Sequence, residues 1–178
     1  MAITADPIQQ ARSSTRAARK RREAATPPLR ILAAVDGSER TGRVIKHLIV
    51  LQTRGMRLEV VLLNVQPEPE DWRLRGYGWF KREAIRERLV GDLAQPIVAS
   101  AGRQLDGAGI AHKDRIELGN LAETTIRCAR EEDCDLIVLA EAPPGRVRRW
   151  LVRTAGVAVG STASAVIALA HVPVVVAK

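Results

Sequence analysis

The stretch Ile31–Glu39, which reads ILAAVDGSE, contains the features from which the fold can be worked out. Its first five residues are continuously apolar, which is typical of a parallel strand buried on both faces. The Asp-Gly-Ser sequence that follows predicts a turn. Beyond the turn, apolar residues recur at helical spacing, at Val44, Leu48 and Leu51. The stretch therefore predicts a buried strand that leads through a turn into a helix ending near Gly55.

The same alternation continues to the end of the chain. Further strands are predicted at residues 58–65, 110–118, 135–140 and 174–176. Charged and apolar residues alternate along 110–118, as in an edge strand. Helices are predicted at 81–105, with Pro96 as a kink or break, and after the capping residue Asn120. A last helix is predicted at 163–170, where Ala163, Val166, Ile167 and Ala170 share a face that packs on the sheet. Strands that alternate with helices predict an open parallel sheet covered on both faces, with ligands at the carboxyl ends of its strands.

The composition is that of an ordinary globular domain. The chain has 178 residues, of which 46% are hydrophobic and 27% charged, so collagen-like, wholly disordered and disulfide-scaffold proteins are excluded. Cys128 and Cys134 are six residues apart in an expected helix, so their side chains would point to different faces. No disulfide framework or zinc site is indicated, and we expect a cytoplasmic protein.

Most of the net charge of +8 belongs to the start of the chain. Residues 1–30 contain seven Lys and Arg against two acidic residues, whereas the remainder contains 21 against 18. Residues 1–29 have few large apolar side chains, so we expect a disordered basic tail ahead of one domain at 30–178. The basic run Arg16–Arg22 leaves two alternatives open, a contact with nucleic acid or another anionic surface, and a targeting peptide.

Residues 154–177 contain no charged side chain and are long enough to span a membrane. Glycine, serine and threonine interrupt this stretch, and Pro173 divides it into a helix and a β-branched strand, Val174–Val176. We therefore expect no membrane span. An apolar strand at the edge of a sheet is a pairing surface, so the sequence also favours a homodimer formed through this last strand.

Three blocks of the sequence resemble the first, middle and last blocks of the universal stress protein family. They are ILAAVDGSE at 31–39, ELGNLAETTIRCAREEDCDLIVLA at 117–140 and GSTASAVIALAHVPVVVAK at 160–178. The resemblance implies an α/β fold of the adenine-nucleotide-hydrolase-like type, with an open five-stranded parallel sheet of order 3-2-1-4-5. It also implies a homodimer and, in one branch of the family, an ATP site.

The resemblance assigns candidate residues to that ATP site. Asp36, followed by Gly37 and Ser38, matches the carboxylate that lies beside adenine and ribose. The glycine motif that holds the phosphates ends in a pattern matched by Gly160, Ser161 and Thr162.

The beginning of this glycine motif departs from the family pattern. Ala140 stands where the first glycine is expected, and the following loop is about seven residues longer than the motif. Gly145 can replace the second glycine, and Arg148 and Arg149 can bind a triphosphate that carries Mg²⁺. The alternative is a decorated loop with solvated arginines, in which Gly160 and Ser161 only cap the last helix.

The segment Trp72–Phe80, which reads WRLRGYGWF, contains four of the five aromatic residues. We expect it to cover the carboxyl edge of the sheet or a dimer seam, and base stacking is the alternative. No motif for hydrolytic or nucleophilic catalysis is present in the sequence. The sequence thus favours a nucleotide-responsive stress regulator. A dimeric interaction module without nucleotide and a binder of nucleic acid through the tail are the alternatives.

Overall fold

The computed structural model describes residues 27–68, 79–140 and 161–178. Five strands in these ranges form one sheet in the order β3-β2-β1-β4-β5, and all neighbouring strands are parallel. The strands are β1 (Leu29–Ala34), β2 (Leu58–Gln66), β3 (Ala111–Leu118), β4 (Leu136–Ala140) and β5 (Val174–Ala177). The expected fold class and strand order are confirmed, and the last strand lies at an edge of the sheet.

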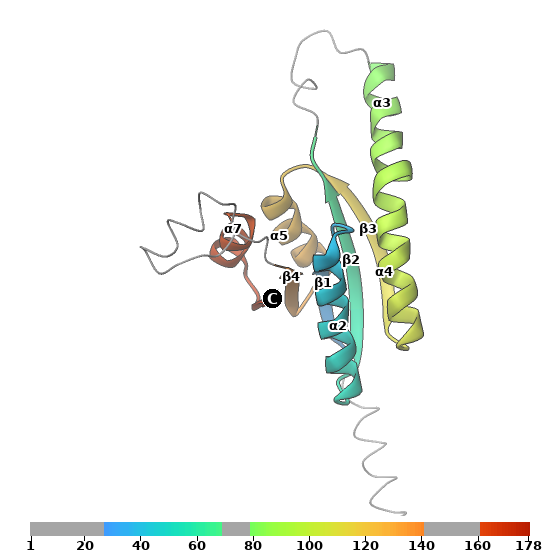
Figure 1. Ribbon diagram of the computed structural model, residues 1–178. Helices are drawn as coiled ribbons and strands as arrows, with labels where there is room; N and C mark the ends of the chain where they lie inside the picture. Colours follow the sequence, from blue (N-terminus) through green and yellow to red (C-terminus); the bar gives the residue numbers. More distant parts are fainter. Residues whose placement is uncertain (1–26, 69–78, 141–160) are drawn as a thin grey trace, which may run out of the picture.

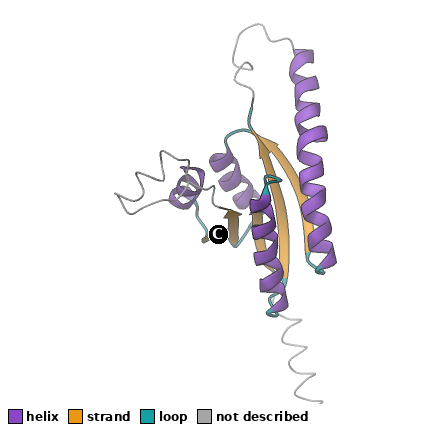
Figure 2. Ribbon diagram, in the orientation of Figure 1, coloured by secondary structure: helices purple, strands orange, loops and turns teal. Residues whose placement is uncertain are grey.

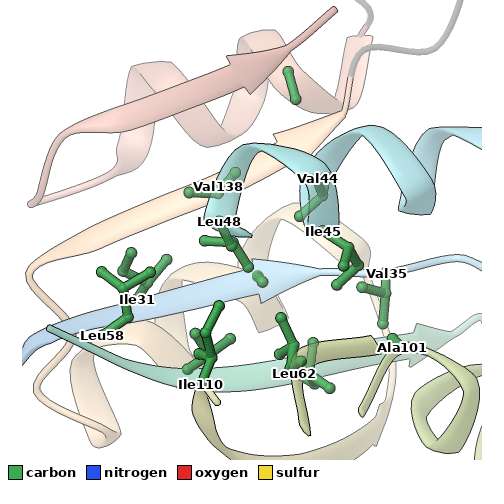
Figure 3. Close-up of a cluster of buried hydrophobic side chains, with 14 of the residues drawn as sticks. Ile31, Val35, Val44, Ile45, Leu48, Leu58, Leu62, Ala101, Ile110 and Val138 are labelled. Atoms are coloured by element: carbon green, nitrogen blue, oxygen red, sulfur yellow. The ribbon is translucent and has the colours of Figure 1, made fainter. Parts of the chain in front are cut away.

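Helices cover both faces of the sheet (Figures 1 and 2). α2 (Glu39–Thr53) and α4 (Gln95–Gly107) pack on one face, and α5 (Leu121–Glu131) and α7 (Ser161–Leu169) on the other. The side-chain alternation of β1 produces this arrangement, because Ile31 faces the first pair of helices and Leu32 faces the second. Figure 3 shows the first core, where Val44 and Leu48 of α2 meet residues of the sheet.

The helix expected at 81–105 is longer and contains an irregular turn. α3 (Trp79–Arg88), the π-helix η2 (Leu89–Ala94) and α4 follow one another without an interruption. Pro96 lies in the first turn of α4, where its missing N–H is tolerated. The Gln95 N–H donates a hydrogen bond to the Val90 carbonyl, five residues earlier, as in a π-helical turn. Such wide turns form where the regular α-helical hydrogen bonding is disturbed. Pro96 therefore neither ends nor breaks the helix.

β3 is the other edge strand, as its alternating pattern predicts. Its charged side chains form ion pairs with the end of α5. The Arg115 guanidinium bonds Glu117 Oε1 through Nε at 2.8 Å, Glu132 Oε1 through Nη1 at 2.9 Å, and the Glu131 carboxylate. Arg127 completes the network by pairing with Glu117 and Glu131, both at 3.0 Å. The network fastens α5 to the edge of the sheet.

Two expectations about side chains are wrong. Cys134 does not share a helix with Cys128, because α5 ends at Glu131; both thiols are free and buried in the core beneath α5 and α7. In α7, Ala163 and Val166 are buried as expected, but Ile167 is 46% exposed. α7 lies over β4 and β5 at the edge of the sheet, where less of the sheet is available to cover the Ile167 side chain.

Several candidates lie outside the described residues. They are the basic run Arg16–Arg22, most of the aromatic segment Trp72–Phe80, and the loop residues Gly145, Arg148, Arg149 and Gly160. In the described ranges 27–68, 79–140 and 161–178, no helix has the length and hydropathy needed to cross a membrane.

Candidate nucleotide site

The carboxyl ends of β1 and β4 form the topological switch point of the sheet. From β1 the chain proceeds outward to β2 and β3, and it then crosses to β4 and β5 on the opposite side. The connections that leave β1 and β4 therefore diverge, one to α2 on the first face and the other to α7 on the second. In open α/β sheets, such a divergence leaves the crevice in which ligands bind. Asp36 and Ala140, both expected at the site, lie at this point.

The turn after β1 is fixed by Thr41. Its Oγ1 accepts hydrogen bonds from the backbone N–H groups of Asp36 and Gly37, both at 3.0 Å. Gly37 has φ +75°, which favours glycine. Ser38 then caps α2, because its side chain accepts a hydrogen bond from the Arg40 N–H at 3.2 Å. The sequence Asp-Gly-Ser thus makes a tight turn that holds the Asp36 side chain at the mouth of the crevice.

The two oxygens of the Asp36 carboxylate have different environments. Oδ1 accepts hydrogen bonds from the Ser38 N–H at 3.0 Å, from the Ser38 hydroxyl at 2.6 Å and from the Thr41 hydroxyl at 3.1 Å. Oδ2 bonds only Arg40, whose Nη2 lies 2.6 Å away, among the contacts of the described residues. The Asp36 side chain is 48% exposed. Oδ1 therefore anchors the carboxylate, and Oδ2 is the oxygen on which a ligand can bind.

Hydrogen bonding keeps this carboxylate ionised. Partial burial on its own would raise the pKa of Asp36, but the hydrogen bonds from Ser38, the positive charge of Arg40 and the Thr41 hydroxyl outweigh it, so that the pKa is lowered. At neutral pH the site presents an ionised carboxylate paired with Arg40, and its oxygens are hydrogen-bond acceptors suited to the hydroxyl groups of a sugar.

Asn64 supports the site, and sequence analysis missed it. Asn64 is 2% exposed. Its Nδ2 donates a hydrogen bond of 2.7 Å to the carbonyl of Val35, the residue directly before Asp36. The Gln66 amide in turn donates to Asn64 Oδ1 at 2.8 Å. These bonds hold the end of β1 to β2 where the regular strand pairing stops. The signal in the sequence was an asparagine directly after the apolar run Val60–Leu63, since asparagine is depleted in strands.

The other side of the crevice comes from β4 and α7. Ala140 is the last residue of β4 and pairs with Ala177 of β5. Because β5 is parallel to β4, α7 must begin at the carboxyl edge, and it begins at Ser161, the residue after Gly160. The structure thus brings Asp36, Ala140 and the first turn of α7 to one edge of the sheet. Arg40, which no motif singled out, contacts Asp36 and is the other residue of the candidate site missed from the sequence.

Known proteins share this architecture. A family model described as universal stress protein family matches residues 29–178. UspA from Lactobacillus plantarum is 21% identical with a TM-score of 0.63, and the match covers 86% of this chain and 99% of that one. A universal stress protein from Archaeoglobus fulgidus, solved in complex with dAMP, is 22% identical with a TM-score of 0.52 and coverages of 84% and 98%.

A universal stress protein solved in complex with cAMP is 14% identical with a TM-score of 0.57, and the match covers 85% of this chain and 97% of that one. No curated protein matches the sequence. The solved structures support a common fold, and the family model covers all the described residues from β1 to β5. The chain belongs to the universal stress protein family.

Proposed function

We propose that this protein is a regulator that binds an adenine nucleotide, with the nucleoside end held by Asp36 at the switch point between β1 and β4. The observation that carries the proposal is the Asp36 carboxylate, which three hydrogen bonds to Oδ1 fix in place, while Oδ2 is bonded by Arg40 alone among the described residues. A fixed, ionised carboxylate is a strong acceptor for ribose hydroxyl groups. The dAMP and cAMP complexes of two structural relatives support the adenine nucleotide as ligand class.

The phosphate end of the proposal rests on the sequence. The first turn of α7 begins at Ser161, and amide groups at a helix N-terminus attract phosphate oxygens. Gly145, Gly160, Arg148 and Arg149 belong to the same loop and would add backbone donors and cations. We propose ATP as the nucleotide on these grounds. Mg²⁺ would be carried mainly by the phosphate oxygens, as it is in many nucleotide sites.

Calorimetric titration with adenosine and with 2′,3′-dideoxyadenosine tests the role of Asp36. In Asp36→Asn we expect adenosine to bind about tenfold or more weakly, because a hydrogen bond to a charged acceptor contributes roughly 1.5–3 kcal/mol. Dideoxyadenosine lacks the 2′- and 3′-hydroxyl groups of the ribose, so its affinity should be nearly the same for the variant and the unmutated protein. An equal loss for both ligands would show that Asp36 does not bind the ribose.

Asp92→Asn is the matched control. Asp92 also forms an ion pair with an arginine four residues away, Arg88, at 3.8 Å, but it lies on η2 and is 73% exposed. Its removal should leave the binding of both nucleosides unchanged. A ligand at 100 times its Kd should stabilise the fold by about 2.7 kcal/mol, which raises the melting temperature. The proposal of an adenine-nucleotide site fails if neither adenosine nor ATP with Mg²⁺, at millimolar concentration, gives a calorimetric signal or raises the melting temperature of the unmutated protein.

We also propose that the protein forms a homodimer through β5. β5 lies at the edge of the sheet with three half-buried valines, and Ile167 and Leu169 of the neighbouring α7 are 46% and 61% exposed. An apolar edge strand beside exposed apolar side chains is a suitable surface for a second copy. Val175→Lys should dissociate the dimer, whereas Val50→Lys on α2 should not. A mass of 19.4 kDa for the unmutated protein in light scattering at micromolar concentration would contradict the dimer.

The cytoplasm is the proposed location of the protein. Cys128 and Cys134 are free and buried, and burial raises the pKa of the Cys134 thiol to about 11. Such thiols react slowly and suit a reducing compartment. Microscopy of the tagged full chain tests the location directly.

A further inference from the structure

We propose that Arg40 is a built-in competitor of the nucleotide: in the free protein it occupies Oδ2 of Asp36, the oxygen that the ribose needs, and its removal tightens nucleoside binding. This inference rests on the proposed function, because it concerns how the same site is regulated.

The contacts of Arg40 place its guanidinium on Oδ2 of Asp36. Nη2 lies 2.6 Å from Asp36 Oδ2, and Nε donates to the Ser38 hydroxyl at 3.0 Å. Oδ1 is already bonded by Ser38 and Thr41, so Oδ2 is the oxygen left for a ligand. The guanidinium is thus held at two points across the acceptor that a ribose hydroxyl would use.

Competition follows whether Arg40 leaves or stays when the ligand binds. If the hydroxyl displaces the guanidinium, the ion pair must be broken, and its free energy is subtracted from that of binding. If the hydroxyl shares Oδ2 with Arg40, it meets a carboxylate whose charge is already neutralised, which is a weaker acceptor. In both cases the unmutated protein binds a neutral nucleoside less tightly than a protein without the cation.

Stability of the helix does not account for a cation at this position. Arg40 is the second residue of α2, and the positive end of the helix dipole disfavours a cation in the first turn. The side chain is stabilised there by Asp36, which lies before the helix, at the end of the turn from β1. The Arg40–Asp36 ion pair therefore connects the first turn of α2 with the candidate site, and it adds no contact with the core.

The test measures adenosine binding by Arg40→Gln, with Arg43→Gln as the matched control. Arg43 lies one turn further along α2, is exposed and carries the same charge. Adenosine is chosen because it has no phosphate that Arg40 could attract. At low salt we expect Arg40→Gln to bind adenosine about two- to fivefold more tightly than the unmutated protein, as for loss of a partly exposed ion pair, and Arg43→Gln to bind it with unchanged affinity.

Salt gives a second readout. Because salt weakens the ion pair but leaves the neutral ligand unaffected, the unmutated protein should bind adenosine more tightly as salt is raised from about 20 mM to about 500 mM. The advantage of Arg40→Gln should shrink over the same range. Arg40→Met, which cannot donate a hydrogen bond to Asp36, should reproduce the effect of Arg40→Gln.

The outcomes separate this inference from the proposed function. If the unmutated protein binds adenosine and neither Arg40 variant binds it more tightly, the inference is wrong and the nucleotide site stands. Weaker binding by both Arg40 variants would make Arg40 a ligand-binding residue and also overturn the inference. If neither the unmutated protein nor the Arg40 variants bind adenosine or ATP at millimolar concentration, the proposed function fails and the inference with it. Binding that appears only in the Arg40 variants would support the inference.

Discussion

Gly37 in the turn after β1 packs so closely against α4 that a β-carbon at this position would lie 2.8 Å from Cγ1 of Ile97. The atom it would meet is close to the backbone of α4, where the side chain has little freedom to move aside. The turn that carries Asp36 is therefore wedged between the end of β1 and α4, and its position depends on a residue without a side chain.

Gly37→Ala should destabilise the protein. The close contact with Ile97 and the φ of +75° both oppose a β-carbon, and together we expect a loss of about 1–3 kcal/mol in the free energy of unfolding, measured by urea denaturation. Gly42→Ala is the control within α2, because nothing lies within 4 Å of its β-carbon. It should instead stabilise the helix by about 0.5–1 kcal/mol, and a loss there would contradict the packing argument.

Asn64→Leu should also lower stability, by about 1–3 kcal/mol, since it removes the buried donor to the Val35 carbonyl and leaves that carbonyl without its side-chain partner. Because this bond fixes the end of β1, nucleoside affinity should fall as well. Gln66→Ala, which removes only the outer bond to Asn64 Oδ1, should have an effect of about 0.5–1 kcal/mol. Equal losses in urea denaturation would show that the inner bond has no special role.

The ion pairs between β3 and α5 make stability depend on pH. Hydrogen bonds from Arg115 and Arg127 lower the pKa of Glu131. At Glu117 partial burial acts in the opposite direction, but hydrogen bonds from the same two arginines outweigh it and the pKa is again lowered. A carboxyl group whose pKa is lowered in the folded state stabilises the protein when the pH is above the pKa of the unfolded state, near 4.5. This stabilisation is lost as the pH falls through the pKa of the folded state.

Arg115→Met should therefore destabilise the protein at neutral pH, by up to about 1 kcal/mol, and have much less effect at acidic pH where the carboxylates are protonated. Urea denaturation at pH 7 and pH 3 measures the difference. Arg103→Met on the exposed side of α4 is the control and should be nearly neutral at both pH values. A loss for Arg115→Met that is the same at both pH values would attribute the effect to packing.

Deletion of residues 1–26 should leave the thermal midpoint nearly unchanged, because this sequence has few large apolar side chains to bury. If its basic run binds nucleic acid, the affinity of the full chain for a duplex should fall steeply with salt and disappear on deletion. Replacement of Arg19, Lys20 and Arg21 by Gln removes positive charge but keeps the length of the chain. This variant distinguishes an effect of charge from an effect of the missing residues. A large drop in the midpoint would show that the segment belongs to the folded domain.

The sequence by itself determined the sheet and most of the site on the β1 side. The apolar run at Ile31, the alternation along β3 and the capping residue Asn120 are local patterns, and local patterns suffice because burial on two faces, burial on one face and helix capping each demand a distinct spacing. The placement of Asp36 at the end of a buried strand also followed from the sequence, since the residues after such a strand lie at the carboxyl edge.

Only the tertiary structure decided which side chains act on that carboxylate. The partner of Arg40 depends on the direction in which the turn after β1 points, and the bond from Asn64 to the Val35 carbonyl depends on the pairing of β1 with β2. Pro96 remained within one long helix because η2 widens the turn before it, and Cys134 lies in the core but after the end of α5. The Asp36–Arg40 pair spans only four residues but depends on the geometry of the turn between them. The others depend on contacts between residues distant in the sequence or on a backbone irregularity, and no local spacing encodes either.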